Sequence, residues 1–233
     1  STRFMRGLDS EGNWRTPFNP RSSNHRNDDY CEGTAWQWTW FVPHDVDGLV
    51  KLMGGREAFI GKLDSLFIAA SAMEGESVSV DISGLIGQYA HGNEPSHHIA
   101  HLYNYVGQPW RTQELVDEVL HTLYFNDPDG LSGNEDCGQM SAWFILNSMG
   151  FYQVCPGKPV YSIGRPLFNK ATIHLKDGKT FTIVAPGNSR ENKYVQKMLL
   201  NGRELATPFF NHQDIADGGT LELTMGDQPL IEK

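Results

Sequence analysis

The sequence has little positive charge and no long apolar run, and both absences exclude classes of function. Its 19 lysine and arginine residues are outnumbered by 28 aspartate and glutamate residues, which gives a formal net charge of −9. Nucleic acids and anionic membranes are bound through basic patches, and the sequence contains none. No apolar stretch is long enough to cross a bilayer, and the first residues lack a signal-peptide pattern. Neutral or cationic ligands, including a divalent metal ion, fit the charge balance better.

Cysteine is also scarce. The three cysteines, Cys31, Cys137 and Cys155, are not spaced like zinc ligands, and their odd number excludes a complete set of disulfides within the chain. Cys31 and Cys137 each adjoin an acidic residue that is a candidate for the site, so these two thiols are expected near each other. A disulfide between them is one alternative, and free buried thiols are the expected state.

The hydrophobic content of 39% with 11% aromatic residues is that of a globular protein with a core. Residues 1–45 are rich in turn formers and predict a long loop. Apolar spacing then predicts helices, with a change to antiparallel strands after about residue 153. The fold class is therefore mostly α with a C-terminal antiparallel β portion: residues 1–153 as helical hairpins that carry the site and residues 154–233 as the β segment. The expected helices are 33–42, 45–53, 56–70, 96–106, 113–125 and 139–150; the expected strands lie in 171–176, 180–184, 197–205 and 220–225.

Two stretches concentrate acidic, amide and imidazole groups at predicted helix entrances. Residues 133–143 read Gly-Asn-Glu-Asp-Cys-Gly-Gln-Met-Ser-Ala-Trp, which puts two adjacent carboxylates on a glycine-flanked turn before an apolar helix. Residues 92–98, Gly-Asn-Glu-Pro-Ser-His-His, repeat the same opening. Glu32 is a third acid in a similar place. A catalytic carboxylate needs rigid support, and the start of a helix provides it. The acidic, amide and imidazole groups at these helix entrances therefore predict a carbohydrate-processing site.

Glycosidic bond hydrolysis needs one protonated carboxyl and one carboxylate. On spacing alone, the alternative is that these acids only cap helices and turns. Two adjacent acids repel each other, which a cation or a function would offset. Asn93 and Glu94 offer the oxygen ligands that calcium prefers. His97 and His98 are expected to contact sugar hydroxyls or carboxylates, with core or surface histidines as the alternative. The candidate acids are Glu32, Glu94, Asp127, Asp129, Glu135 and Asp136.

Longer motifs around these residues resemble glycoside hydrolase family 92. The resemblance is carried by residues 92–98 and 133–143, and it extends over most of the chain. Further matching segments are Tyr30-Cys31-Glu32-Gly33, Leu102-Tyr103-Asn104-Tyr105-x-Gly107-Gln108-Pro109-Trp110, Gly150-Phe151-Tyr152 and Gly164-Arg165-Pro166-Leu167-Phe168.

The resemblance implies a calcium-dependent exo-α-mannosidase that inverts the anomeric centre. It implies part of an (α/α)₆ barrel followed by β-sandwich-like strands, and a substrate that is a mannose-containing oligosaccharide or N-glycan, as for α-1,2-mannosidases. It also implies the role of each candidate residue. Glu32 would be the general acid and Asp136 the base, with Asp129 in reserve; Asn93 and Glu94 would hold Ca²⁺; Trp36, His97, His98 and Gln139 would line the sugar pocket.

Family members are several times longer than 233 residues, so the chain is expected to be the C-terminal part of a catalytic region whose N-terminal β-sandwich domain is missing. The alternative function is a non-catalytic carbohydrate-binding fragment. The family also implies a secreted or periplasmic setting, where calcium and glycans are plentiful, and no nucleic-acid or membrane partner.

Overall fold

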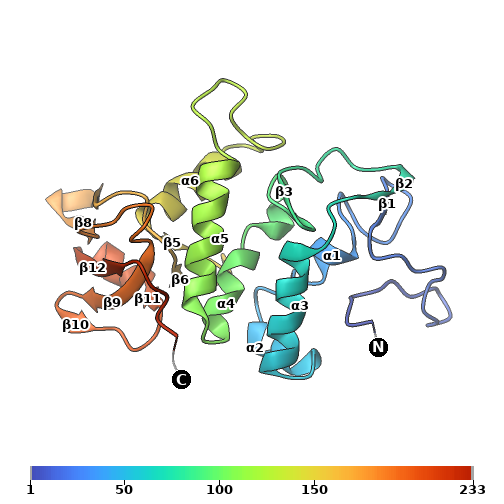
Figure 1. Cartoon of the computed structure of the whole chain (residues 1–233), viewed down its shortest axis with the longest axis horizontal. Helices are drawn as coiled ribbons and strands as arrows, with labels where there is room; N and C mark the ends of the chain where they lie inside the picture. Colours follow the sequence, from blue (N-terminus) through green and yellow to red (C-terminus); the bar gives the residue numbers. More distant parts are fainter. Residues whose placement is uncertain (1, 232–233) are drawn as a thin grey trace. The chain divides into compact units, whose positions relative to one another are not determined.

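The computed structural model describes residues 2–231, which form a mixed α/β protein and not a mostly α one (Figure 1). The chain divides into two compact units, Ser1–Ile99 with Phe125–Met140 and Ala100–Tyr124 with Ser141–Lys233. This division differs from the single boundary expected near residue 153. In the second unit, the side-chain oxygen of Gln113, on a helix, accepts a hydrogen bond from the Val195 N–H, on a strand, at 3.1 Å. The helix and the strand therefore belong to the same unit.

Three helices form the core of the first unit. They are α1 (Ala35–Trp38), α2 (Val46–Leu52) and α3 (Arg56–Ile68). Thr34 and Gln37 form a reciprocal capping box at the start of α1. This helix is shorter than predicted, because the backbone continues after it in three-residue turns, in which the Phe41 N–H donates to the Trp38 carbonyl at 3.2 Å. The buried ring of Trp40 meets Phe59 of α3 edge to face, with centroids 5.4 Å apart.

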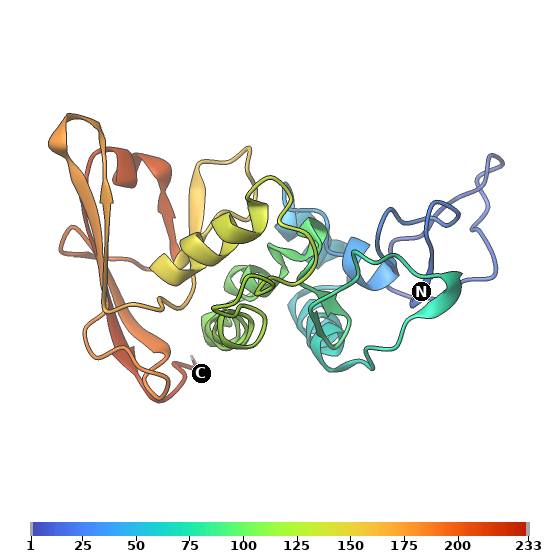
Figure 2. The same ribbon diagram turned by 90° about the horizontal axis from the view of Figure 1, so that it is seen from above.

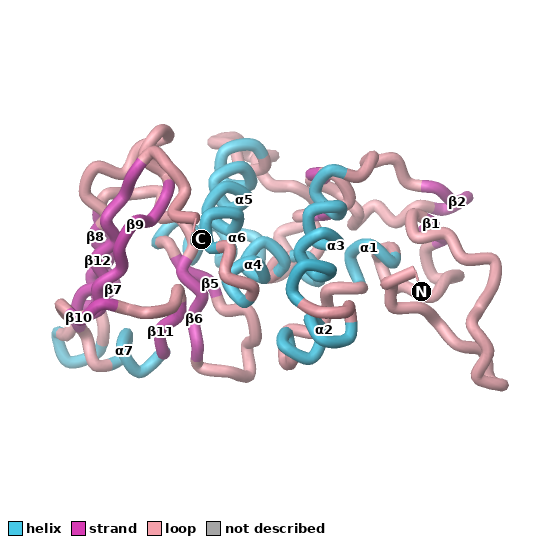
Figure 3. The backbone as a smooth tube through the Cα atoms, turned by 60° about the horizontal axis from the view of Figure 1, so that its bottom comes forward, coloured by secondary structure: helices cyan, strands magenta, loops and turns pink. Residues whose placement is uncertain are grey.

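The rest of the first unit consists of loops and very short strands. The strands are β1 (Ser22–Asn24) parallel to β2 (Glu74–Ser77), and β3 (Leu85–Ile86) antiparallel to β4 (Tyr89–Ala90). Figure 3 shows the residues before α1 almost entirely as loop, as the sequence predicts. The sequence predicts residues 71–92 to be a connection without regular strands. The strands found there were missed because they are too short to show an alternating pattern.

The helix predicted over 96–106 is wrong in its first half. The structure has two 3₁₀ turns, η1 (Glu94–Ser96) and η2 (Ile99–His101), before the short helix α4 (Leu102–Tyr105). The Ser96 N–H donates to the Asn93 carbonyl at 3.1 Å, so the turn begins at Asn93 and Ser96 does not cap a helix. Pro95 suits this position, since a first-turn residue needs no N–H partner.

Helices α5 (Pro109–Thr122) and α6 (Gln139–Met149) follow. α5 begins at Pro109, earlier than predicted, because proline is favoured at the first helical position. Thr112 therefore lies inside the helix and is not its cap; its hydroxyl donates to the Ala100 carbonyl at 2.9 Å. No helix among residues 2–231 combines the length and the apolar character needed to cross a membrane.

The second unit holds two sheets. A five-stranded sheet has the order β10-β9-β12-β8-β7, and Figure 2 shows its strands in orange and red. Its β12–β8 pair is parallel, so the β portion is not wholly antiparallel as predicted. The reason is that the last strand, β12, lies between β8 and β9, which run in opposite directions. It must therefore be parallel to one of them. The strands are β7 (Lys170–His174), β8 (Thr180–Val184), β9 (Tyr194–Leu200), β10 (Arg203–Glu204) and β12 (Gly219–Gly226), with turn η3 (Lys176–Gly178) between β7 and β8.

A smaller sheet of order β11-β6-β5 completes this unit. Alternate residues of the larger sheet are buried, and Phe181 and Leu221 are among those fully enclosed in a core that also takes in Phe151 and Phe210 of the smaller sheet. The elements are β5 (Phe151–Tyr152), β6 (Val160–Ile163), β11 (Phe209–Asn211) and the short helix α7 (His212–Ala216).

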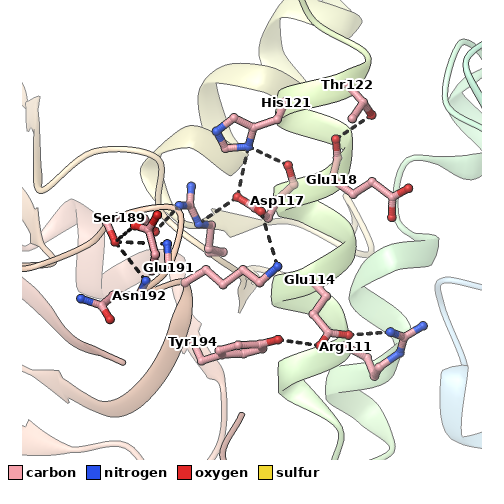
Figure 4. Close-up of polar contacts among 12 residues, drawn as sticks. Arg111, Glu114, Asp117, Glu118, His121, Thr122, Ser189, Glu191, Asn192 and Tyr194 are labelled. Carbon is pink, nitrogen blue, oxygen red and sulfur yellow. Dashed lines mark hydrogen bonds and ion pairs between the residues drawn. The ribbon is translucent and has the colours of Figure 1, made fainter. Parts of the chain in front are cut away.

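Charged side chains join α5 to the strands of its unit (Figure 4). The Asp117 carboxylate receives Arg165 Nε at 3.2 Å and Lys193 Nζ at 3.8 Å, and the Arg165 side chain is 2% exposed. One turn earlier on α5, Glu114 accepts the hydroxyl proton of Tyr194 at 2.7 Å. α5 is thus fixed by buried charge pairing as well as by apolar contacts.

Candidate active site

The two Gly-Asn-Glu stretches lie against each other in the first unit. A Cβ added to Gly133 would lie 3.0 Å from the Gly92 carbonyl oxygen and 2.8 Å from Ser83 Oγ. A Cβ on Gly92 would lie 2.0 Å from the same Ser83 Oγ. Only glycine allows the two backbones to approach so closely. The repeated glycine in the sequence therefore brings the acids that follow it near one another.

Three of the predicted acids interact. Burial raises the pKa of the half-buried Glu94, and the neighbouring Asp136 carboxylate, with which it forms a hydrogen bond, raises this pKa further. Glu32 adds a third, smaller repulsion in the same direction. Like charges that crowd together favour the protonated form of one of them. The arrangement therefore makes Glu94 easier to protonate than an isolated glutamate, next to two exposed acids, Glu32 and Asp136.

Two of these acids have an unusual backbone conformation. Glu32 has φ = 50° and Asp136 has φ = 49°, in the left-handed region that non-glycine residues rarely adopt. Cys137 (φ = 56°) and Gly138 (φ = 93°) continue the left-handed run into α6. Such strain of about 1–3 kcal/mol per residue persists where the surroundings hold it, and it clusters at functional sites.

Asn93 connects two parts of the site. Its side-chain N–H₂ donates to the Glu32 backbone carbonyl at 2.6 Å, across 61 residues of sequence. This bond helps to hold Glu32 in its left-handed conformation. Asn93 was predicted as a calcium ligand; its nitrogen is used here for positioning.

His97 and Gln139 are brought together as predicted site residues. His97 Nε2 lies 2.9 Å from the His91 carbonyl oxygen, and the Gln139 side-chain nitrogen lies 3.1 Å from His97 Nδ1. A carbonyl can only accept, so His97 carries its proton on Nε2 and accepts at Nδ1. Burial lowers the pKa of His97 to about 4, so the ring is neutral near pH 7. His97 thus orients the Gln139 amide. Sequence reasoning missed His91, because a backbone acceptor leaves no signal in the sequence.

The other two predicted pocket residues are placed differently. His98 is buried, and its Nε2 lies 2.8 Å from the Trp40 carbonyl oxygen, which is the arrangement of a core histidine. Trp36 packs against Phe4 edge to face, with centroids 4.8 Å apart, and the Lys62 ammonium lies 4.3 Å from its ring. These contacts favour a structural role for both residues over direct contact with sugar.

Asp129, the reserve base, interacts within its own turn. It is exposed on the turn after Phe125, and its N–H donates to Asp127 Oδ1 at 3.0 Å. The carboxylates that raise the pKa of Glu94 are those of Asp136 and Glu32. The geometry therefore favours Asp136 over Asp129 as the candidate base.

All three cysteines are free, as expected, but none of them is buried. Cys31 and Cys137 are exposed and Cys155 is partly exposed. The reason is that Cys31 and Cys137 lie on the exposed turns that carry Glu32 and Asp136.

The metal-binding capacity of this cluster depends on oxygen ligands. Among residues 2–231, no group of three or more His, Cys, Asp and Glu side chains is arranged to hold a metal ion. Glu94 and the Asn93 amide oxygen are nevertheless hard ligands of the kind that calcium takes, together with backbone carbonyls and water. The crowding of three carboxylates fits a cation, because a cation would reduce their repulsion.

The buried histidines predict a loss of stability at mildly acidic pH. Burial lowers the pKa values of His97 and His98 to about 4, whereas an unfolded histidine titrates near 6.5. Between these values the unfolded chain binds more protons, so stability falls as the pH falls from about 6.5 to 4. Each histidine is expected to cost about 2 kcal/mol at pH 5 relative to pH 7.5, measured by urea unfolding.

A His98→Gln variant tests this pH dependence. Its amide can still donate to the Trp40 carbonyl, so the variant should lose part of the pH dependence while it still folds. His174→Gln, at an exposed position of β7, is the control and should behave like the parent chain. An unchanged pH dependence in His98→Gln would contradict the assignment of a neutral, buried His98.

The chain matches a known family over almost its whole length. The profile of the glycosyl hydrolase family 92 catalytic domain matches residues 1–227. The chain belongs to glycosyl hydrolase family 92. The motifs that indicate this family in the sequence are residues 92–98 and 133–143. Their glycines and acids lie close together in the structure.

Solved structures of the family agree with the fold. A family 92 α-mannosidase from Bacteroides thetaiotaomicron, in complex with mannoimidazole, matches with a TM-score of 0.91 and 40% identity over 98% of this chain. A family 92 inverting mannosidase from the same organism matches with a TM-score of 0.83 and 42% identity over 97% of this chain. A secreted glycosidase of Arthroderma benhamiae, uncharacterized, is 34% identical over 84% of the chain.

The chain spans only part of each relative. It covers 30% and 31% of the two Bacteroides thetaiotaomicron chains and 24% of the Arthroderma benhamiae protein. The family match covers residues 1–227, which include the acid cluster.

Proposed function

We propose that this chain carries the catalytic acids of an inverting, calcium-dependent exo-α-mannosidase acting on α-1,2-linked mannose in glycans. The observation that supports it most is the cluster of Glu94, Asp136 and Glu32, in which the pKa of Glu94 is raised by burial and by the other two acids. The family's solved relatives are α-mannosidases, one of them described as inverting. The secreted relative supports a secreted or periplasmic setting.

The proposed roles follow from the arrangement of the acids. Inversion requires a base that activates water on one face of the sugar and an acid that protonates the leaving oxygen on the other. Asp136 acts as the base, because it is an exposed carboxylate in contact with Glu94 at the centre of the acid cluster. Glu32 acts as the general acid from its own turn.

Supporting residues position these two acids. Asn93 fixes the Glu32 backbone through its 2.6 Å bond, and His97 fixes the amide of Gln139 three residues after Asp136. Gln139 is then placed to contact a sugar hydroxyl. A neutral His97 suits this role, because an imidazolium would lose the acceptor at Nδ1 that holds the amide.

Calcium would be held by Glu94 and the Asn93 oxygen, with further oxygens from backbone, water and sugar. When bound, it would contribute contacts to sugar hydroxyls that favour a distorted ring. Because Glu94 must lose its proton to bind a cation, calcium affinity should rise with pH. Calorimetric titration of calcium into the chain at pH 5.5 and pH 7.5 measures this without an activity assay, and Glu94→Gln should bind calcium much more weakly at both.

Mannose release from α-1,2-linked mannobiose tests the function. Release should require calcium, stop with a chelator and be lost in Glu32→Gln. Asn169→Ala, which removes an exposed amide in the second unit, should release mannose like the parent chain. Mannobiose binding without any release would favour the alternative of a non-catalytic carbohydrate-binding fragment, and the absence of both binding and release would overturn both readings.

A further inference from the structure

A separate pocket lies in the first unit, within the loop that precedes α1. Residues 15–30 line a half-open pocket with a volume of about 270 Å³. Ligand pockets for drug-sized molecules measure about 300–1,000 Å³, so this one suits a smaller ligand such as a single sugar ring. The pocket does not include any of the predicted site residues.

The walls of the pocket are fixed by their own bonds. The Arg15 guanidinium pairs with the Asp29 carboxylate. Both oxygens of Asp28 accept backbone N–H groups, from Asn24 at 2.6 Å and from Tyr30 at 3.1 Å. The Tyr30 hydroxyl donates to the Met5 carbonyl at 2.5 Å. A pocket held in this way is preformed, so a ligand need not order it.

The groups left for a ligand are neutral and polar. The charges of Arg15 and Asp29 offset each other, and Asp28 is already bonded. Among the residues that the structure describes, the Asn27 amide and the Thr16 hydroxyl line the pocket without a hydrogen bond of their own. An amide and a hydroxyl both donate and accept, which is the pattern that sugar hydroxyls need.

An aromatic wall adds to this character. Phe18 lines the pocket, and the Arg6 guanidinium carbon lies 4.3 Å from the centroid of its ring, which keeps the ring in place. Aromatic rings give apolar C–H surfaces of a ligand a place to pack. A free anion is a poorer fit, because the one guanidinium that lines the pocket is paired with Asp29.

We infer that residues 15–30 form a saccharide-binding pocket for a sugar unit of the glycan other than the one whose bond is cut. The loop that builds it continues through Tyr30 directly to Glu32, so one segment of chain carries both the pocket and the general acid. The inference rests on the proposed function for the identity of the ligand as a mannose-containing glycan. It assigns Asn27 and Thr16 as the residues that recognise the additional sugar.

The test compares oligosaccharide binding in a chain that cannot hydrolyse its ligand. Calorimetry measures the Kd for α-1,2-linked mannobiose and for linear mannotriose and mannotetraose in Glu32→Gln, in Glu32→Gln with Asn27→Ala, and in Glu32→Gln with Asn169→Ala as the matched control. The longer ligands should bind the Asn27→Ala chain about three- to tenfold more weakly than the control, the cost of one lost hydrogen bond. Thr16→Val, which keeps the shape of the side chain, should act in the same direction.

The outcomes separate this inference from the proposed function. Weaker binding of any of these ligands to the Asn27→Ala chain than to the control supports the pocket, even if the parent chain releases no mannose. Equal binding to the two chains, for every ligand, overturns the pocket, even if mannose release by the parent chain establishes the enzyme. Circular dichroism of each variant identifies a misfolded one, in which case Thr16→Val alone decides by the same comparison.

Discussion

Replacing Asp136 by asparagine is expected to lower kcat for α-1,2-mannobiose by about 10²–10⁴-fold, the usual contribution of a general base. The substitution keeps the size of the side chain and removes the carboxylate that would take the proton of water. It should also lower the pKa of Glu94, since the charge of Asp136 now raises that pKa. Steady-state kinetics measures the first effect, and NMR titration of the Glu94 carboxyl carbon measures the second.

Asp129→Asn is the matched control, because Asp129 is an exposed aspartate on the preceding turn. Its kcat should stay within about threefold of the parent value. If Asp129→Asn lost activity and Asp136→Asn kept it, Asp129 would be the base. A lower pKa of Glu94 together with unchanged kcat in Asp136→Asn would confirm the contact but reject the catalytic role.

The sequence located the acid cluster through local signals. Gly92 and Gly133 open two similar stretches, and both glycines prove necessary because the two backbones meet there. What the sequence could not indicate is the bond from Asn93 to the Glu32 carbonyl, which joins residues 61 positions apart. Spacing along a chain reports which groups share a turn and carries no information on which turns meet.

The histidine pair shows the same limit. His97 and His98 are neighbours with the same side chain, and nothing in the sequence indicates which partner each of them takes. The 3₁₀ turn at Glu94–Ser96 directs them to different partners, the Gln139 amide for His97 and the Trp40 carbonyl for His98. The helix predicted over 96–106 does not distinguish these partners, and the contact of His98 agrees with the stated alternative of a core histidine.

The fold was predicted best where patterns are local. α3 (Arg56–Ile68) and the β7–β8 hairpin around Asp177-Gly178 follow the expected ranges closely. The parallel β12–β8 pair was not foreseen, since β12 alternates in the same way whichever neighbour it pairs with. Pairing direction depends on the path of the chain, and residues 185–218 contain no local signal for it.

Replacing Asp117 by asparagine is expected to lower the free energy of unfolding by about 3–5 kcal/mol, because it leaves the buried Arg165 charge without its partner. Arg165 is 2% exposed, and burial lowers its pKa while Asp117 opposes this shift. His121 also pairs with Asp117, at 3.1 Å, as Figure 4 shows. Urea unfolding at pH 7.5 measures the change.

Two further variants decide whether charge is the cause. Lys197→Met breaks the exposed pair with Glu204, 3.4 Å apart, and should cost no more than about 1 kcal/mol. The double variant Asp117→Leu with Arg165→Met removes both buried charges and should recover most of the stability, because apolar residues of similar volume often replace a buried pair without loss. If the double variant is as unstable as Asp117→Asn, the loss comes from packing around α5 and not from an unpaired charge.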